Sequence, residues 1–168
     1  MISSTERILP APAGTPLPPD IPHPRPLLFT IEVDTSSLSE SVPHVNNVAY
    51  LSWIDRIAEQ AGEVFGHDRM QLAREGRVWF AARHEVDYLA EVFEGHELVA
   101  ATWIHDHRRT SCRRDTVIHR VEDDRPVARA RSTWTWIDLE TRRPCRMPAE
   151  LVEALDPLQR AGSGGTTH

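Results

Sequence analysis

The stretch SESVPHVNNVAYLSWID, residues 39–55, decides the fold because the spacing of its apolar residues changes within it. Its first part is polar, with an acid, a proline, a histidine and two adjacent asparagines. From Val45 to Phe65, apolar residues recur at spacings of three and four, which predicts a long amphipathic helix. Gly66 follows, and glycine commonly ends a helix by adopting a left-handed conformation. More polar side chains precede this helix than a single cap requires.

Segments on both sides of the helix show the alternation typical of β-strands. LLFTIEV, residues 27–33, places Leu27, Phe29, Ile31 and Val33 on one face. Four segments rich in Val, Ile, Thr and Trp follow the helix, at residues 77–93, 97–106, 110–121 and 126–138. Short connections between consecutive strands indicate an antiparallel meander, and a lone helix is best buried when such a sheet curls around it. The sequence therefore predicts an α+β fold with a curled antiparallel sheet of about five strands around one long central helix.

One folded domain, residues 27–155, is expected in this chain of 168 residues. Residues 1–26 are rich in proline and are expected to form an extended or disordered arm. Residues 156–168 are expected to form a flexible tail. Before it, PAELVEAL, residues 148–155, predicts a short helix with proline at its first turn.

Composition excludes several classes of function. The net charge of −6 and the pI near 5.8 disfavour binding to nucleic acid or to an anionic membrane surface. No apolar run is long enough to span a bilayer and no secretion signal is recognised, so a cytoplasmic location is expected. Cys112 and Cys145 lack metal-ligand spacing and fit a reducing compartment. The sequence HDH at residues 105–107 lacks an apparent third ligand, so no metal site is predicted.

The start of the predicted helix carries the residues of chemical interest. The first N–H groups of a helix lack intrahelical acceptors, and the helix dipole adds partial positive charge there. Glu40 lies seven residues before Asn47, in a loop that can fold back over this end. An acid beside an open N–H can hydrolyse an acyl compound, because the acid attacks or activates water while the N–H stabilises the oxyanion. A structural role also fits, with Asn46 or Ser41 as the cap, His44 packed in the loop and Glu40 as a solvated acid.

The stretch ESVPHVNNVAYLSWID resembles the signature of hotdog-fold acyl-CoA thioesterases of the 4-hydroxybenzoyl-CoA thioesterase type. In that signature an aspartate, three residues and then H-V-N-N-x-x-Y-L open the central helix. Three later segments are similar to the family's strands and tail: HEVDYLAEVFEGHELVAATWI, RRTSCRRDTVIHR and ARARSTWTWIDLETRRPCRMPAEL. The resemblance covers Phe29–Leu151 in order. It implies a hotdog fold and hydrolysis of an acyl thioester carried by coenzyme A or by an acyl carrier protein.

The resemblance assigns roles residue by residue. Glu40 takes the place of the catalytic aspartate, and Asn47 the helix-start position whose backbone N–H polarises the thioester carbonyl. His44 is grouped with these two at the catalytic site. The other motif positions, which shape the pocket, are Asn46, Tyr50 and Asp55. Two residues depart from the family pattern: Glu40 is one methylene longer than aspartate, and Pro43 replaces the usual glycine, which fixes φ and removes an N–H.

In hotdog proteins the site lies in a cleft at a dimer interface, so the resemblance implies a homodimer, with a tetramer as the alternative. The acyl group is expected beside the helix, lined by Trp53, Phe80 and Tyr88. The coenzyme A phosphates are expected to meet the basic strand, since guanidinium groups suit phosphate oxygens. The candidates there are Arg108, Arg109, Thr110, Ser111, Arg113 and Arg114. A solvated strand edge is the alternative for these arginines. Coenzyme A is part of the substrate, and no separate cofactor is expected.

Two other functions stay open at this point. A non-catalytic dimer that binds acyl thioesters is one, in which glutamate at position 40 marks lost chemistry. A hotdog dehydratase is the other. The family's dehydratases use a different histidine-containing layout, which the HVNN context of His44 does not favour.

Overall fold

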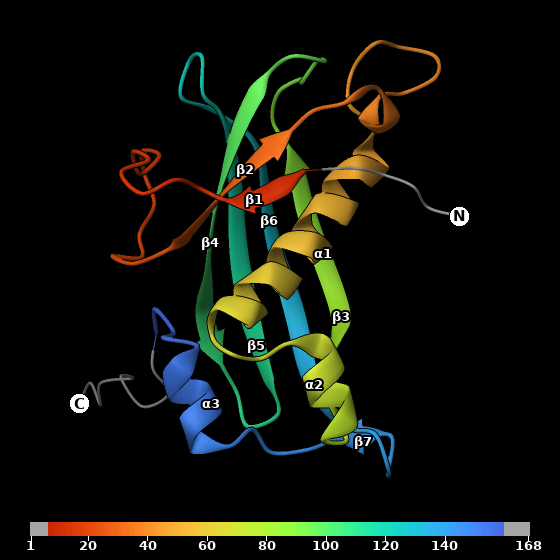
Figure 1. Ribbon diagram of the computed structural model, residues 1–168, viewed down its shortest axis with the longest axis vertical. Helices are drawn as coiled ribbons and strands as arrows, with labels where there is room; N and C mark the ends of the chain where they lie inside the picture. The colour runs from red at the N-terminus through yellow and green to blue at the C-terminus, as the bar shows by residue number, and fades with distance from the viewer. Residues whose placement is uncertain (1–6, 160–168) are drawn as a thin grey trace, which may run out of the picture. The chain divides into compact units, whose positions relative to one another are not determined.

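The computed structural model describes residues 7–159. In chain order the elements are β1 (Ile8–Pro10), β2 (Leu27–Glu32), a 3-10 turn (Thr35–Ser37), α1 (Asn47–Val64), α2 (Arg69–Arg74), β3 (Arg77–Tyr88), β4 (Glu97–His107), β5 (Ser111–Arg120), β6 (Arg125–Asp138), β7 (Arg143–Pro144) and α3 (Ala149–Ala154) (Figure 1). The strands form one curled antiparallel sheet in the order β1-β2-β4-β5-β6-β3, and β7 pairs with β6. The predicted α+β fold is confirmed, with the five expected strands as β2–β6 and two short strands added.

The chain divides into two compact units, and each is described by itself. The first unit contains the residues up to Ala58, Val86–Thr102 and Thr116–Ala130, and the second contains Glu59–Glu85, Trp103–Asp115 and the residues from Arg131 onward. Helix α1 and strands β3–β6 contribute residues to both units.

The core of the first unit follows from the periodicities of β2 and α1. Phe29 and Ile31 on alternate positions of β2 are buried, as the alternation predicts. On α1, Trp53 and Ile57 are one turn apart and have no exposed surface. These two elements therefore present their apolar faces inward, and the polar start of α1 is left toward solvent.

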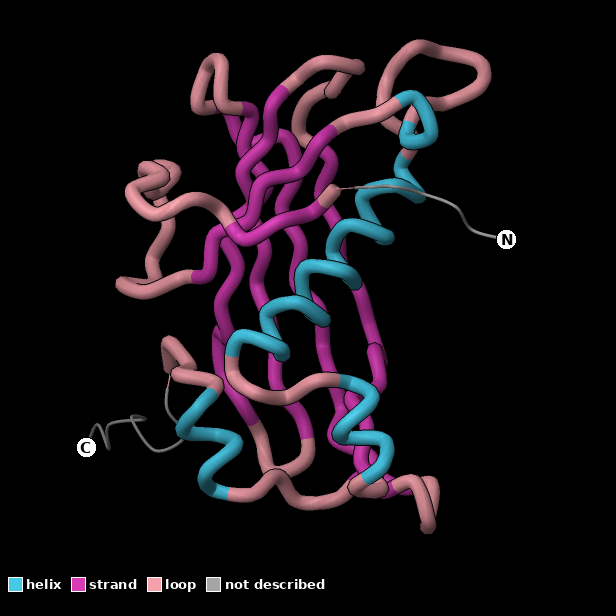
Figure 2. The backbone as a smooth tube through the Cα atoms, in the orientation of Figure 1, coloured by secondary structure: helices cyan, strands magenta, loops and turns pink. Residues whose placement is uncertain are grey.

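Strand β1 lies within the proline-rich segment that was expected to be an arm. It pairs antiparallel with β2, with Ile8 opposite Ile31, and Figure 1 shows the two strands next to each other. Ile8 is buried, and the Ala11 N–H donates to the Leu28 carbonyl at 2.8 Å, so apolar burial and backbone pairing both dock this segment on the sheet edge. Figure 2 shows the long loop between β1 and β2, and most prolines of this segment lie in that loop.

In the second unit, α1 ends as the sequence predicts. Gly66 has φ of 76° and its N–H bonds to the Glu63 carbonyl, while the His67 N–H reaches back to the Gly62 carbonyl. This is the hydrogen-bond pattern of a Schellman cap, which requires a residue that tolerates positive φ. The predicted C-terminal helix is α3, and Met147 before it is buried.

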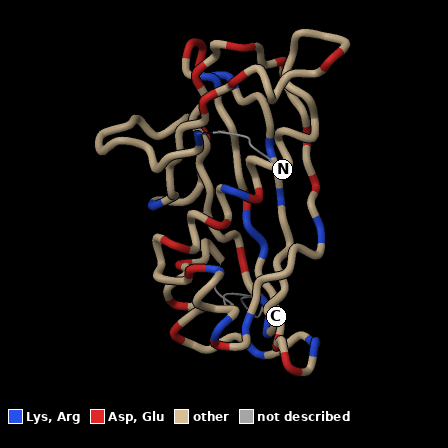
Figure 3. The backbone as a smooth tube through the Cα atoms, turned by 45° about the vertical axis from the view of Figure 1, so that its right-hand side comes forward, with Lys and Arg blue, Asp and Glu red and all other residues tan. Residues whose placement is uncertain are grey.

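The segment after α3 is hydrogen-bonded as far as it is described. The Leu158 and Gln159 N–H groups donate to the Ile104 and His105 carbonyls of β4 at 2.9 and 2.8 Å. Residues 160–168 of the expected tail and residues 1–6 of the expected arm lie outside the described residues. Within residues 7–159, no helix combines the length and apolar character needed to cross a membrane. Acidic and basic positions are interspersed along the chain (Figure 3).

Candidate functional site

Three backbone contacts clamp the loop that precedes α1. The Asn46 N–H donates to the Ser37 carbonyl at 2.8 Å, Leu38 and Val45 form an isolated antiparallel bridge, and the Ser39 N–H donates to the His44 carbonyl at 2.8 Å. Residues 39–44 therefore form a closed loop directly before the helix. Glu40 lies in this loop and is exposed, and its carboxylate has no hydrogen-bond or ion-pair partner among the described residues.

Asn46 is the cap of α1. Its side-chain oxygen accepts the Val48 N–H at 2.9 Å, and its carbonyl accepts the Ala49 N–H at 2.9 Å. Ser41, the alternative cap, instead has its hydroxyl 3.3 Å from that of Ser39. The Asn47 backbone N–H has no acceptor within residues 7–159. Capping thus leaves one N–H of the first turn open, at the position that the sequence assigned to carbonyl polarisation.

Pro43 shapes the loop through a tight turn. The His44 N–H donates to the Val42 carbonyl at 2.8 Å, which closes a three-residue turn centred on Pro43. The φ that proline imposes suits the inverse γ-turn. The missing N–H of Pro43 is therefore no loss to the turn itself. The His44 imidazole Nδ1 lies 3.0 Å from Oε1 of Glu91, a residue that the sequence analysis did not single out.

An aromatic cluster packs below the start of α1. The Tyr50 ring lies 5.1 Å from the Trp53 ring and 5.3 Å from the Tyr88 ring, both edge-on. The Tyr88 hydroxyl donates to the Asn47 carbonyl at 3.4 Å. Burial raises the pKa of Tyr50 to about 12, with a further rise from Tyr88 that Arg120 opposes. Tyr50 is therefore a neutral phenol at physiological pH.

The three positions expected to line the acyl group differ in exposure. Trp53 is fully buried in the core of the first unit, and its indole N–H has no partner within the described part of the chain. Tyr88 is 42% exposed in the first unit, and Phe80 is 61% exposed in the second. Tyr88 and Phe80 thus present free aromatic surface, whereas Trp53 supports the helix from beneath. Asp55 is half-buried on α1 and is not a free carboxylate.

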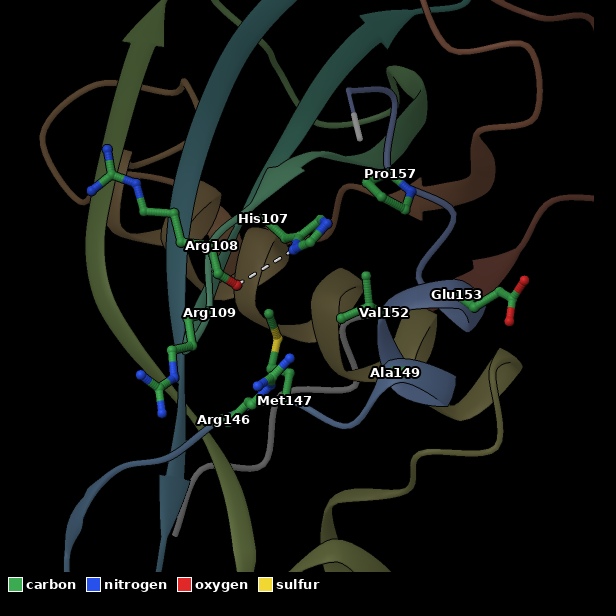
Figure 4. Close-up of a pocket in the computed structure, with 9 residues that line it drawn as sticks. All are labelled: His107, Arg108, Arg109, Arg146, Met147, Ala149, Val152, Glu153 and Pro157. Carbon is green, nitrogen blue, oxygen red and sulfur yellow. Dashed lines mark hydrogen bonds between the residues drawn. The ribbon is translucent and has the colours of Figure 1, made fainter. Parts of the chain in front are cut away.

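The second unit holds a cavity of about 740 Å³ between the β4–β5 turn and the C-terminal segment. Its lining residues are His107, Arg108, Arg109, Arg146, Met147, Ala149, Val152, Glu153 and Pro157. In Figure 4, α3 carries Ala149, Val152 and Glu153, and the Glu153 carboxylate points away from His107 and from the arginines of the β4–β5 turn. Within residues 7–159, the guanidinium groups of Arg108, Arg109 and Arg146 have no acidic partner. The cavity therefore combines apolar surface with unpaired positive charge, which suits an anionic group.

The other residues expected at the basic strand either have partners already or are buried. Arg113 forms a two-pronged ion pair with Asp106, which lowers the pKa of that carboxyl. Arg114 is buried and is not presented to solvent. The Thr110 carbonyl accepts the Trp136 N–H at 2.8 Å, and Ser111 lines a smaller cavity of about 250 Å³ with Arg113. Arg109 is thus exposed and unpaired, whereas the charge of Arg113 is already matched.

The side chains of the HDH segment diverge. His105 lies 3.0 Å from Asp115, and Asp106 pairs with Arg113. Asp115 also accepts both prongs of Arg131, at 2.6 and 2.8 Å. Among the described residues, no group of three or more His, Cys, Asp or Glu side chains is arranged to hold a metal ion.

Sequence reasoning missed Glu91 and Arg146. Glu91 lies 47 positions from His44, so no local spacing connects them. Arg146 belongs to the RRPCRMPAEL segment that carried the resemblance, and its closeness to a proline-started helix was the available signal. The chain contains no lysine, so arginine supplies all of its permanently charged cationic side chains.

Solved structures share this fold. A 1,4-dihydroxy-2-naphthoyl-CoA thioesterase from Synechocystis aligns with a TM-score of 0.73 and 16% identity, over 80% of this chain and 98% of that one. A probable thioesterase from Escherichia coli gives 0.67 and 22%, over 76% and 95%. A Staphylococcus aureus protein in complex with CoA gives 0.69 and 16%, over 77% and 81%. At these identities the likeness shows the fold alone, which is the hotdog fold.

Sequence comparison identifies the family. Curated proteins gave no match. The sequence profile of the thioesterase-like superfamily matches residues 40–155, more than half of the chain, and the match begins at Glu40. The chain therefore belongs to the thioesterase-like superfamily.

Proposed function

We propose that this protein hydrolyses acyl-CoA thioesters, with Glu40 as the reacting carboxylate and the Asn47 backbone N–H as the donor to the carbonyl oxygen. The observation that carries the proposal is the open Asn47 N–H at the start of α1, directly after a clamped loop that presents the unpaired carboxylate of Glu40. An N–H aimed at the developing oxyanion stabilises the transition state more than the ground state. The match to the 4-hydroxybenzoyl-CoA thioesterase signature supports the same two positions.

Two routes use these groups. In one, the Glu40 carboxylate attacks the thioester carbon, the coenzyme A thiolate leaves, and water hydrolyses the resulting anhydride. In the other, Glu40 takes a proton from water as the oxygen of that water adds to the carbon, and the thiolate then leaves and is protonated. Both give a free acid and a thiol. A thiolate is a good leaving group, so neither route needs a strong general acid.

Coenzyme A is the proposed carrier, with an acyl carrier protein as the alternative. The unpaired guanidinium groups of Arg108, Arg109 and Arg146 support phosphate recognition in the second unit. The Staphylococcus aureus protein of similar fold was solved in complex with CoA, and the Synechocystis protein is named for an aromatic acyl-CoA. The exposed aromatic rings of Phe80 and Tyr88 suit an acyl group with apolar surface.

We also propose that the protein is a homodimer, with a tetramer made of two such dimers as the alternative. Strand β3 is at one end of the strand order, so its outer backbone groups have no neighbouring strand within residues 7–159. Phe80 is exposed on this strand, and Val48 and Leu51 are exposed on α1. Light scattering after size exclusion tests this, and Phe80→Arg is expected to shift the protein toward the monomer. A cytoplasmic location fits the free thiols of Cys112 and Cys145 and a coenzyme A substrate.

The decisive experiment compares Glu40→Gln with Glu94→Gln on a panel of acyl-CoAs, measuring thiol release. Glu94 is an exposed acid in the β3–β4 loop and serves as the matched control. Glu40→Gln is expected to lose nearly all turnover with unchanged circular dichroism, and Glu94→Gln to match the wild type. Full activity in Glu40→Gln would contradict the assignment. Acyl-CoA binding without turnover in the wild type would instead favour a non-catalytic binder.

A further inference from the structure

The contact between His44 and Glu91 joins two loops of the first unit that are distant in sequence. Nδ1 of His44 lies 3.0 Å from Oε1 of Glu91, and the two side chains are 33% and 65% exposed. The ring's other nitrogen, Nε2, has no partner in residues 7–159. A carboxylate at Nδ1 accepts that N–H, so the neutral ring keeps Nε2 as a free proton acceptor.

Two hydrogen bonds fix the backbone of Glu91 and Val92, and a fixed backbone limits where the Glu91 carboxylate can lie. The Val45 N–H donates to the Val92 carbonyl at 2.8 Å, which ties the β3–β4 loop to the loop before α1. The Arg120 guanidinium donates to the Glu91 carbonyl at 3.0 Å. Arg120 is itself fixed by a two-pronged ion pair with Asp123. Glu91 therefore approaches His44 from a braced position.

We propose that Glu91 is a positioning residue that fixes the ring direction and tautomer of His44, so that Nε2 can carry a proton during thioester hydrolysis. This inference rests on the proposed function. On the route in which Glu40 attacks the thioester, Nε2 accepts a proton from the water that hydrolyses the anhydride on Glu40. The neighbouring Glu91 carboxylate balances the imidazolium charge, and the proton then passes to the sulfur of the released thiolate. Atoms balance as acyl thioester plus water giving acid plus thiol, and Glu91 is unchanged.

A merely structural ion pair has a different signature. Exposed ion pairs contribute little to stability, so loss of Glu91 should leave the free energy of unfolding nearly unchanged. If Glu91 positions His44, the loss of Glu91 should instead change which nitrogen of His44 carries the proton. That loss should also lower kcat with little effect on KM, because the contact matters in the chemical step.

The first arm of the test is spectroscopic and needs no activity. Protein labelled with ¹⁵N-histidine is examined by long-range ¹H–¹⁵N correlation above the imidazole titration range, with His44 assigned by its loss in His44→Gln. We expect the wild type and Glu91→Gln to keep the proton on Nδ1, since an amide oxygen also accepts it. Glu91→Ala is expected to move the proton to Nε2. An unchanged tautomer in Glu91→Ala would overturn the proposal.

The second arm is kinetic and uses the full chain. Glu91→Ala is expected to lower kcat on the order of 10- to 100-fold with KM within about twofold, and Glu91→Gln less, while Glu94→Ala on the same loop has no effect. In a His44→Ala background, Glu91→Ala should cost nothing more. An equal further loss in that background would refute action through His44. A wild type with no turnover would contradict the proposed function, whereas the tautomer measurement would still decide whether Glu91 fixes the ring.

Discussion

The side chain of Asn46 accepts the backbone N–H of Val48 at 2.9 Å and so caps α1 from the residue just before its start. With the Ala49 N–H also bonded to Asn46, the first turn keeps one open donor, on Asn47. The capping side chain and the open backbone N–H thus belong to adjacent residues, and the cap does not use the open donor.

Replacing Asn46 with alanine should lower the free energy of unfolding by about 1 kcal/mol, because the Val48 N–H loses its acceptor. Asn46→Asp keeps a capping oxygen and adds favourable charge at the helix N-terminus, so it should be at least as stable as the wild type. Urea denaturation followed by circular dichroism measures both. Equal stability of Asn46→Ala and the wild type would show that the cap is dispensable.

Arg109→Ala and Arg146→Ala should each raise KM for acyl-CoA about tenfold, since each removes a charge-assisted contact to phosphate. Turnover at saturation should stay near that of the wild type. The same acyl group on pantetheine, which lacks the nucleotide, should show no change in KM. Arg129→Ala is the matched control, because Arg129 is exposed and does not line the cavity. A parallel rise in KM for acyl-pantetheine would argue against phosphate recognition.

Tyr50 and Tyr88 should be energetically coupled. Their rings meet edge-on at 5.3 Å, and such pairs contribute about 0.5–1.5 kcal/mol beyond the area they bury. In a double-mutant cycle with Tyr50→Leu and Tyr88→Ala, the two losses of unfolding free energy should not add, and the difference should be about 1 kcal/mol. Strict additivity in urea denaturation would mean that the contact contributes nothing of its own.

Stability should fall as pH rises above 9. Burial raises the pKa of Cys112 from 9.0 to about 12, and the pKa of Tyr50 from 10.0 to about 12. Between the unfolded and folded values the native state holds more protons than the unfolded state, so the free energy of unfolding drops with rising pH, by about 1.4 kcal/mol per pH unit for each group. Below pH 9 this contribution is fully present.

Two variants test whether Cys112 and Tyr50 cause this loss of stability at high pH. Cys112→Ala should flatten the fall between pH 9 and 12, and Tyr50→Phe should flatten it between pH 10 and 12. Cys145→Ala is the control, because Cys145 is only partly buried. Urea midpoints at half-unit steps of pH provide the measurement. An unchanged slope in both Cys112→Ala and Tyr50→Phe would place the alkaline lability elsewhere.

Local sequence patterns predicted α1, α3 and strands β2–β6 in their observed order. The period-2 pattern of residues 27–33 became β2, and the spacing of three and four became α1 over Asn47–Val64. Gly66 ends that helix with positive φ, as expected. These features depend on backbone geometry over a few neighbouring residues, which a single sequence displays directly. The open donor at Asn47 follows in the same way from counting the orphan N–H groups of a helix end.

Local patterns do not show which side chains have hydrogen-bond or ion-pair partners, and the three-dimensional fold was needed to see this. Arg109 and Arg113 look alike in RRTSCRR, yet one is unpaired in a cavity and the other is matched to Asp106. Docking of β1 on β2, and the approach of Glu91 to His44, join residues about 20 and 47 positions apart. Such contacts depend on strand register and on how loops are braced. Long-range packing sets both, and no local pattern of residues encodes them.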